Sequence, residues 1–323
     1  MTCNCAPSSE QATVVATRSG RTLAAQLVVW MVVQMKPQIF GLMVAVGIIH
    51  AEWDALTVRD HARVRAEAGE LALQCPADLD TDALGTFTGE VERTGTPLET
   101  AIAKARLGMA ASGTALGLAN EGSFGAHPAN PFIPGNQELL VLVDEERGMV
   151  VQESLLSHRT CHSQTRALDI DALQPYLQRI GFPRQGVIVR PAVAPAGVHL
   201  YKGLTDWTTV ANALGMCAHA SEDGHALVQP DLRAHLSPLR MRVIRRLGWR
   251  MAERLARLCP SCASPGFGRL ESRSGLPCAW CAEPTRLPLA EIQGCSACSH
   301  RETRPPAHGL READAGYCDR CNP

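Results

Sequence analysis

The end of the chain carries eight cysteines in a regular pattern, four C-x-x-C pairs between residues 259 and 321. A gap of 15 residues separates the first two pairs, and a gap of 19 residues separates the last two. A C-x-x-C turn places two thiolates on one metal ion, and a second turn completes a tetrahedron. The pattern therefore predicts two structural zinc ions held in tandem ribbons. The predicted ligands are Cys259, Cys262, Cys278, Cys281, Cys295, Cys298, Cys318 and Cys321.

The spacing leaves the pairing of these turns open. Each adjacent set of two pairs has a gap typical of a zinc ribbon, which favours sequential pairing over a cross-braced arrangement. Redox-active dithiols and disulfides are the other chemistries available to such pairs. A site closed by four thiolates has no open coordination position, so any catalysis must lie upstream of the cysteines.

Composition limits the partners and the compartment. The formal net charge is −1 and aromatic residues make up 4% of the chain, which does not suit a general polyanion binder or a base-stacking platform. Hydrophobic residues make up 46% of the 323 residues, enough for a sizeable core. Thirteen cysteines, eight of them in zinc spacing, indicate a reducing and therefore cytoplasmic environment.

An apolar run at residues 23–49 raises the question of a membrane segment. Gln34, Lys36 and Pro37 interrupt the run, and each half is shorter than the roughly 20 apolar residues that span a bilayer. Buried elements of a core are the favoured interpretation, ahead of a kinked membrane segment or a signal-like segment. We expect a disordered N-terminus at residues 1–11, one domain at 12–258 and the cysteine module at 259–323.

Hydrophobic periodicity predicts strands that alternate with helices, and hence an α/β domain with a mixed or parallel sheet and flanking helices. We expect helices over residues 57–73, 97–111, 169–180 and 205–218, the last capped by Thr205. We expect strands over residues 13–16, 116–119, 186–190 and 198–202, and a hairpin over 138–154. The stretch 120–136, rich in Gly and Pro, is expected to be a long loop.

Two polar stretches are candidates for chemistry. A basic turn with Thr17 and Arg21 follows the first strand and precedes an expected helix over residues 22–34, an arrangement that can bind an anion through the backbone N–H groups at the helix start. Further along, Asp80 and Asp82 lie on a Gly-rich stretch ahead of a helix, and Glu121 follows a strand. Carboxylates on loops near Lys and Arg could hold Mg²⁺ against a phosphate, although Asp and Thr are also ordinary turn formers.

Three motifs carry a resemblance to a known family. They are D-T-D-x-L-G-T-F-T-G-E at 80–90, L-A-x-E-G-S-F-G-x-H-P at 118–128, and the paired C-x-x-C turns at the end. With them the chain resembles the domain of unknown function 6671 family over most of its length from residue 78 onward. The resemblance implies that these motifs form one site, but the family brings no assigned reaction. Ser19 and Arg21 stand where the family's turn has His and Lys.

A weaker similarity, at the level of element order, is to house-cleaning nucleoside-triphosphate pyrophosphatases. It implies that Thr17 and Arg21 contact phosphate, that Lys104 neutralises it, and that Glu99 and Glu121 hold metal. With Asp80 and Asp82 as further acids and Arg233 as a further phosphate contact, the first hypothesis is a Mg²⁺-dependent hydrolase of a nucleotide or other phosphorylated small molecule.

The second hypothesis is a binding protein that uses the zinc ribbons and the Arg-rich helix at 237–258 to contact nucleic acid or another protein. That helix carries seven arginines against one acid, Glu253, and its face is either solvated or contacts phosphate. No Walker loop, G-x-G-x-x-G, G-x-S-x-G or H-E-x-x-H motif is present. A membrane partner is not expected.

Overall fold

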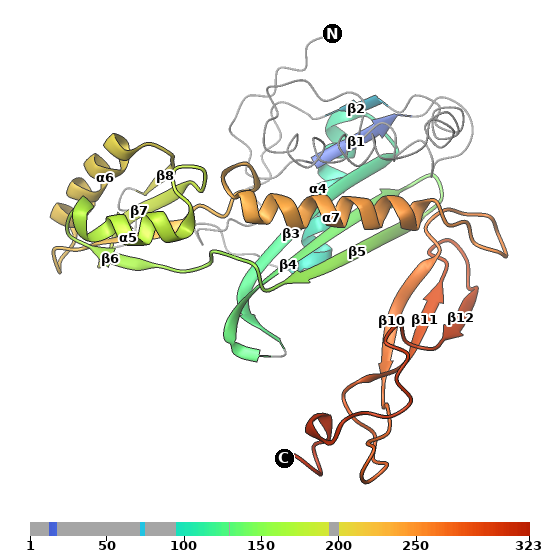
Figure 1. Ribbon diagram of the computed structural model, residues 1–323. Coiled ribbons are helices and arrows are strands. Elements are labelled where there is room, and N and C mark those ends of the chain that lie inside the picture. The colour runs from blue at the N-terminus through green and yellow to red at the C-terminus, as the bar shows by residue number, and fades with distance from the viewer. Residues whose placement is uncertain (1–12, 18–71, 75–94, 129, 194–199) are drawn as a thin grey trace, which may run out of the picture.

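The structure, a computed structural model, describes residues 13–17, 72–74, 95–128, 130–193 and 200–323. Its largest element is a five-stranded antiparallel sheet in the order β2-β1-β3-β4-β5 (Figure 1). The strands are β1 Thr13–Thr17, β2 Ala72–Gln74, β3 Leu116–His127, β4 Asn130–Asp144 and β5 Met149–Ser157. Two helices cover opposite faces of this sheet, α4 Pro97–Ser112 and α7 Pro238–Leu255.

Both faces of the sheet are buried, one against each helix. Since successive side chains of a strand point to opposite sides, alternate residues of each strand pack against α7 and against α4. Leu118 and Leu142 face α7, where they pack with Leu247, Met251 and Leu255. The neighbouring positions in each strand, together with Met109, form a second cluster against α4. The three α7 side chains are at most 1% exposed, so each stabilises the fold by about 1.5–3 kcal/mol through burial.

Local signals fix both ends of α4. Thr96 and Glu99 form a reciprocal capping box, and Pro97 occupies the first turn, where its missing N–H is not needed. The helix ends at Gly113 in the left-handed conformation, with φ +63°. The helix lies close against the sheet because Gly117 of β3 has no side chain: a Cβ there would lie 2.7 Å from the Ala105 carbonyl oxygen.

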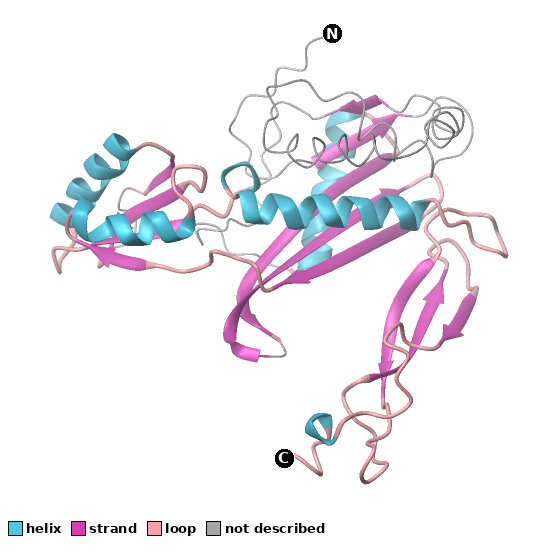
Figure 2. Ribbon diagram, in the orientation of Figure 1, coloured by secondary structure: helices cyan, strands magenta, loops and turns pink. Residues whose placement is uncertain are grey.

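A second, four-stranded antiparallel sheet has the order β6-β9-β7-β8. Its elements are β6 Thr165–Ala167, α5 Ile170–Ile180, β7 Val187–Pro191, β8 Tyr201–Leu204, α6 Trp207–Ala220 and β9 Ala226–Pro230. Both helices lie beside this sheet (Figure 2). Their side chains, among them Leu177 and Leu214, form a separate core with Val187, Val189 and Val228. The short η2 turn, Ala234–Leu236, connects this unit to α7.

The third part is the cysteine module. A three-stranded antiparallel sheet, β10-β11-β12, extends from the C-terminal end of α7 (Figure 1). Its strands are β10 Gly268–Ser274, β11 Pro288–Gly294 and β12 Arg301–Arg304, and the η3 turn Ala315–Tyr317 follows. Among the residues that the structure describes, no helix has both the length and the apolarity needed to cross a bilayer. The apolar run 23–49 lies outside those residues.

The prediction of a parallel or mixed sheet is wrong, because every pair of the described strands is antiparallel. Short connections join β3 to β4 and β4 to β5, and a short connection returns the chain in the opposite direction. The order of strands and helices along the sequence does not reveal these directions. The coarser prediction, a mixture of helices and sheets followed by cysteine clusters, is confirmed.

The expected loop at 120–136 is also wrong, since it forms the continuation of β3 and the first part of β4. Cross-strand pairing outweighs the turn preferences of its glycines and prolines, and Pro134 pairs opposite Ala126 in the exposed part of the hairpin. Residues 72 and 73, expected at the end of a helix over 57–73, belong to β2, and the rest of that helix lies outside the described residues. The cap of α6 is Asp206 rather than Thr205.

Candidate metal centres and polar cleft

The eight cysteines gather into two groups of four, and in each group the sulfur atoms lie within 4.8 Å of one another. Four Sγ–Sγ distances between the turns run from 3.5 Å, between Cys281 and Cys318, to 3.9 Å, between Cys278 and Cys321. A disulfide would bring two sulfurs to about 2.05 Å. Four sulfurs at about 2.3 Å from a central ion would be about 3.8 Å apart. The geometry is therefore that of two tetrahedral metal sites.

The two groups interleave along the chain, so the expectation of sequential pairing is wrong. The first centre contains Cys259, Cys262, Cys295 and Cys298, and the second contains Cys278, Cys281, Cys318 and Cys321. The path of the strands in the module explains why the two groups interleave. Strand β10 carries the chain from the first turn to the second, and antiparallel β11 returns it, with Gly268 paired to Gly294 beside the first centre. The first and third turns therefore meet at one end of the sheet.

The backbone around each centre is arranged to support thiolates. Ala263 and Ala282, each directly after the second cysteine of its turn, have φ of 56° and 59°, which tightens the turn. The backbone N–H of Trp280 donates to the Cys278 sulfur and that of Ala297 donates to the Cys295 sulfur. Hydrogen bonds from Ser264 lower the pKa of Cys262 to about 6. These contacts favour the deprotonated form that binds metal.

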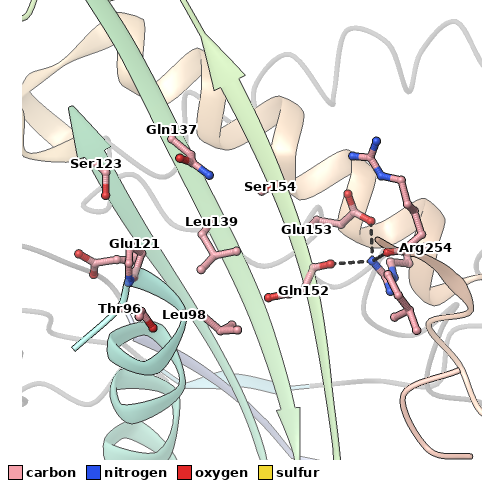
Figure 3. Close-up of a pocket in the computed structure, with 13 residues that line it drawn as sticks. Thr96, Leu98, Glu121, Ser123, Gln137, Leu139, Gln152, Glu153, Ser154 and Arg254 are labelled. Carbon is pink, nitrogen blue, oxygen red and sulfur yellow. Dashed lines mark hydrogen bonds and ion pairs between the residues drawn. The ribbon is translucent and has the colours of Figure 1, made fainter. Parts of the chain in front are cut away.

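A polar cleft of about 320 Å³ lies on the α4 side of the five-stranded sheet. Its walls come from the first turn of α4, from β3, β4 and β5, from the end of α7 and from β10. Hydroxyl and amide side chains of Ser123, Gln137 and Gln152 line it, with Glu121 toward one side and Arg254 toward the other (Figure 3). Such converging polar groups from several elements are typical of a small-molecule site.

One of the residues that line the cleft, Glu121, belongs to a buried ion pair. Nζ of Lys104, from α4, donates to Oε2 of Glu121, from β3, at 2.7 Å, and the two side chains are 1% and 2% exposed. The close contact gives each buried side chain a partner of opposite charge, because burying a charge without one would be strongly disfavoured. The structure thus brings together two of the residues singled out in the sequence, which are 17 positions apart.

Glu99 lies near the cleft but is engaged in the α4 cap. Its Oε2 accepts hydrogen bonds at 2.8 Å from both the backbone N–H and the hydroxyl of Thr96, which itself lines the cleft. The backbone hydrogen bond from Thr96 is the main cause that lowers the pKa of Glu99 below its ordinary value. A carboxylate at this position also interacts favourably with the N-terminal end of the helix.

Arg233 does not line the cleft. Its guanidinium forms a short ion pair with Asp231, with Nη2 at 2.6 Å from Oδ2. Asp231 is fully buried and also accepts from the backbone N–H of Gly203 at 3.0 Å. Among the other predicted phosphate contacts and acids, Thr17 lies in β1. Arg21, Asp80 and Asp82 lie outside the described residues.

A second buried pair, which the sequence analysis did not predict, lies on the α7 side of the sheet. Nε of Arg240 donates to Oε1 of Glu138 at 2.8 Å, and neither side chain is more than 1% exposed. Asn120 donates to the same carboxylate at 3.0 Å. Gly122 leaves room for the pair, since a Cβ there would lie 2.6 Å from Nη2 of Arg240.

A signal for these arginines exists in the sequence. Arg240 lies seven positions before Leu247 and Arg254 seven positions after it, and a helix returns to nearly the same face every seven residues. Both arginines therefore fall on the buried face of α7, where each guanidinium needs a carboxylate or another hydrogen-bond acceptor as its partner. The solvated face expected for this helix is limited to other positions, such as Arg242 and Arg246.

The comparisons with known proteins now bear on this geometry. A model of the family described as domain of unknown function (DUF6671) matches residues 104–323, about two thirds of the chain. The chain belongs to the DUF6671 family. Neither the curated proteins nor the solved structures gave a match.

The DUF6671 region includes most of the features described above. It begins at Lys104 and extends over Glu121, both buried arginines of α7 and all eight cysteines of the two centres. The capping box of α4 and the acidic stretch at 80–90 precede it. The cleft is therefore built from both the family region and the α4 turn immediately before it.

Proposed function

We propose that this DUF6671 protein is a Mg²⁺-dependent hydrolase of a nucleotide or other phosphorylated small molecule, stabilised by two structural zinc ions. The catalytic part corresponds to residues 12–258 and the tandem zinc-ribbon module to residues 259–323, in a cytoplasmic protein. The observation that carries the proposal is the Glu121 carboxylate in the wall of a polar cleft, together with its buried ion pair to Lys104.

Zinc is the metal that best suits the cysteine centres. Four thiolates at tetrahedral spacing are the ligand set of structural zinc, and the ion needs no further ligand there. A chain that belongs in a reducing compartment would keep these thiols available to the metal. The proposed role of both ions is to fold the module, with the reaction taking place elsewhere.

The cleft offers the groups that phosphate chemistry needs. Glu121 supplies a carboxylate, a ligand type that Mg²⁺ prefers, and Lys104 is the cation that neutralises phosphate charge. The first turn of α4 reaches the cleft at Thr96, and the N-terminal end of a helix favours anions. Asp80, Asp82 and Arg21 are proposed from the sequence to add acids and a cation beside these groups.

The test is turnover of a panel of nucleoside triphosphates and phosphomonoesters with Mg²⁺ or Mn²⁺. We expect one substrate class to be hydrolysed, and we expect Glu121→Gln to lower kcat at least about 100-fold, as loss of a metal ligand or base does. Glu145→Gln serves as the control, because Glu145 pairs with Arg106 at an exposed position. No turnover across the panel, or equal activity of Glu121→Gln, would contradict the proposal.

A second candidate is a binding role for the cysteine module. Trp280, in the second C-x-x-C turn, is 80% exposed, and Tyr317 is 55% exposed. Residues 259–323 contain seven arginines and seven acids, which favours a protein partner over nucleic acid. Electrophoretic shifts with single-stranded RNA and duplex DNA over a salt series test the nucleic-acid form. Salt-dependent binding that survives Glu121→Gln would favour this candidate over the hydrolase.

A further inference from the structure

Arg254 links the cysteine module to the wall of the cleft. It lies in the last turn of α7, is 3% exposed and lines the cleft. Its Nη1 donates to the carbonyl oxygen of Gln152 at 2.7 Å and to the Glu153 carboxylate at 3.1 Å, both on β5 (Figure 3). The same side chain donates to Gly266 and Arg269, which follow the first C-x-x-C turn.

The acceptors on the module side are backbone carbonyl oxygens. Nε of Arg254 reaches the carbonyl oxygen of Gly266 at 3.0 Å, and Nη1 reaches that of Arg269 at 3.0 Å. A backbone acceptor stays in place only while the local chain keeps its path. The position of Arg254 therefore depends on the conformation of residues 266–269.

The first cysteine centre lies directly against these residues. The backbone N–H groups of Gly266 and Phe267 both donate to the Arg257 carbonyl oxygen, which fixes the reversal of the chain around the turn. The Phe267 side chain packs in a small core with Cys259 and Cys295, two ligands of the first centre. Without a metal ion these sulfurs have no bond that holds the two turns together, so this small core loses its main constraint.

The packing between the turn and the sheet leaves little room for adjustment. Gly266 has φ +89°, and a Cβ there would lie 2.6 Å from Cγ2 of Val151 on β5. A Cβ on Gly268 would lie 3.1 Å from Nε of Arg254. The module is thus in close contact with the edge strand of the five-stranded sheet. Two of its side chains, Arg269 and Leu270, form part of the cleft wall.

We propose that the first cysteine centre is an integral part of the cleft: its bound metal ion holds Arg254 and the β10 wall in place, and its loss opens that wall. The assignment of the cleft as a ligand site rests on the proposed function, whereas the coupling rests on the contacts of Arg254 alone. The hydrogen bonds of Arg254 to described residues use Nε and Nη1, which leaves Nη2 to contact an anionic group of the ligand.

The second centre provides a matched contrast. Its turns lie at the other end of the β10–β11 hairpin, where Ser274 pairs with Pro288. The module residues that do line the cleft, Arg269 and Leu270, lie at the opposite end of that hairpin, beside the first centre. Loss of metal there is expected to loosen the far end of the module and to leave Arg254 in place.

Hydrogen–deuterium exchange on the zinc-loaded full chain tests the coupling without a substrate. We compare Cys262→Ser, in the first centre, with Cys281→Ser, in the second. Exchange in residues 149–157 and 266–270 is expected to rise about tenfold or more in Cys262→Ser and to stay unchanged in Cys281→Ser, as for local opening of one cooperative unit. Equal exchange of these segments in the two variants would overturn the coupling.

Arg254→Lys keeps the test decisive if a cysteine variant fails to fold. Lysine retains the charge but cannot reach four acceptors, so exchange in 149–157 is expected to rise while two metal ions remain bound. Unchanged exchange in this variant would also overturn the coupling. Since neither readout involves turnover, an absence of hydrolase activity leaves this result unaffected, and the two proposals fail separately.

Discussion

At the scale of single residues, the Lys104–Glu121 pair allows a structural role to be separated from a functional one. Lys104→Met removes the cation that lies 2.7 Å from the buried Glu121 carboxylate, and we expect this loss to lower the free energy of unfolding by about 3–5 kcal/mol. The double variant Lys104→Met/Glu121→Leu removes both charges and is expected to recover most of that loss. Urea unfolding followed by circular dichroism measures both values.

The activity of the double variant gives a separate test of whether the pair takes part in the reaction. If the pair belongs to the catalytic cleft, the double variant is folded and inactive. A double variant as unstable as Lys104→Met would contradict the view that these two groups compensate each other. A folded, fully active double variant would remove Glu121 from the proposed chemistry.

Gly122 gives a second prediction at this scale. A Cβ at this position would lie 2.6 Å from Nη2 of Arg240 and 2.9 Å from Oε1 of Glu138, so Gly122→Ala must displace the buried pair. We expect a loss of about 1–3 kcal/mol in the free energy of unfolding, as for overpacking. Gly125→Ala is the control on the same strand, because its Cβ would meet nothing within 4 Å. Equal stability of the two variants would contradict the tight packing described here.

At the scale of elements, the α4 cap predicts a dependence on pH. Hydrogen bonds from Thr96 hold the pKa of Glu99 below its ordinary value of 4.5 in the folded state. A depressed folded pKa means that the stabilisation is present above pH 4.5 and is lost as the pH falls through the folded value. The stability difference between the wild type and Glu99→Gln should therefore be largest near pH 6 and shrink below pH 4.5.

Denaturant unfolding of both proteins across this range is the measurement. Other groups that titrate, including the cysteine ligands, affect both proteins equally and cancel in the difference. A difference that stays constant from pH 6 to pH 3 would show that the charge of Glu99 does not stabilise the start of α4.

Individual elements differ in how far the sequence predicts them. The ends of α4 follow from Pro97 and Gly113. The turn between β4 and β5 lies where the sequence predicts it, whereas β4 begins at Asn130, well before the expected start at residue 138. The length of β3 was not expected either, because glycines at 122 and 125 signal a turn in isolation. The pairing with β4 overrides that signal, and such pairing depends on residues distant in the sequence.

At the scale of the whole molecule, the cysteine spacing identifies the ligands but not their partners. Each C-x-x-C turn is local and can be recognised in the sequence. The choice between sequential and interleaved centres depends on the path of β10 and β11, which returns the third turn to the first. In the candidate site, too, the residue types can be recognised in the sequence, but the contacts between distant residues cannot. Lys104 and Glu121 were singled out by residue type, whereas the approach of Arg254 to β5 depends on how α7 ends against the module.

The two cysteine centres interleave along the chain, and the zinc content of paired cysteine variants tests this arrangement. Tightly bound zinc is measured after dialysis against a competing chelator. Cys262→Ser/Cys295→Ser removes two ligands from one centre, so about one of two zinc ions should remain. Cys259→Ser/Cys278→Ser removes one ligand from each centre and should weaken both, leaving less than one zinc ion per chain. The reverse result, with one ion kept by Cys259→Ser/Cys278→Ser and both lost from Cys262→Ser/Cys295→Ser, would contradict the interleaved arrangement.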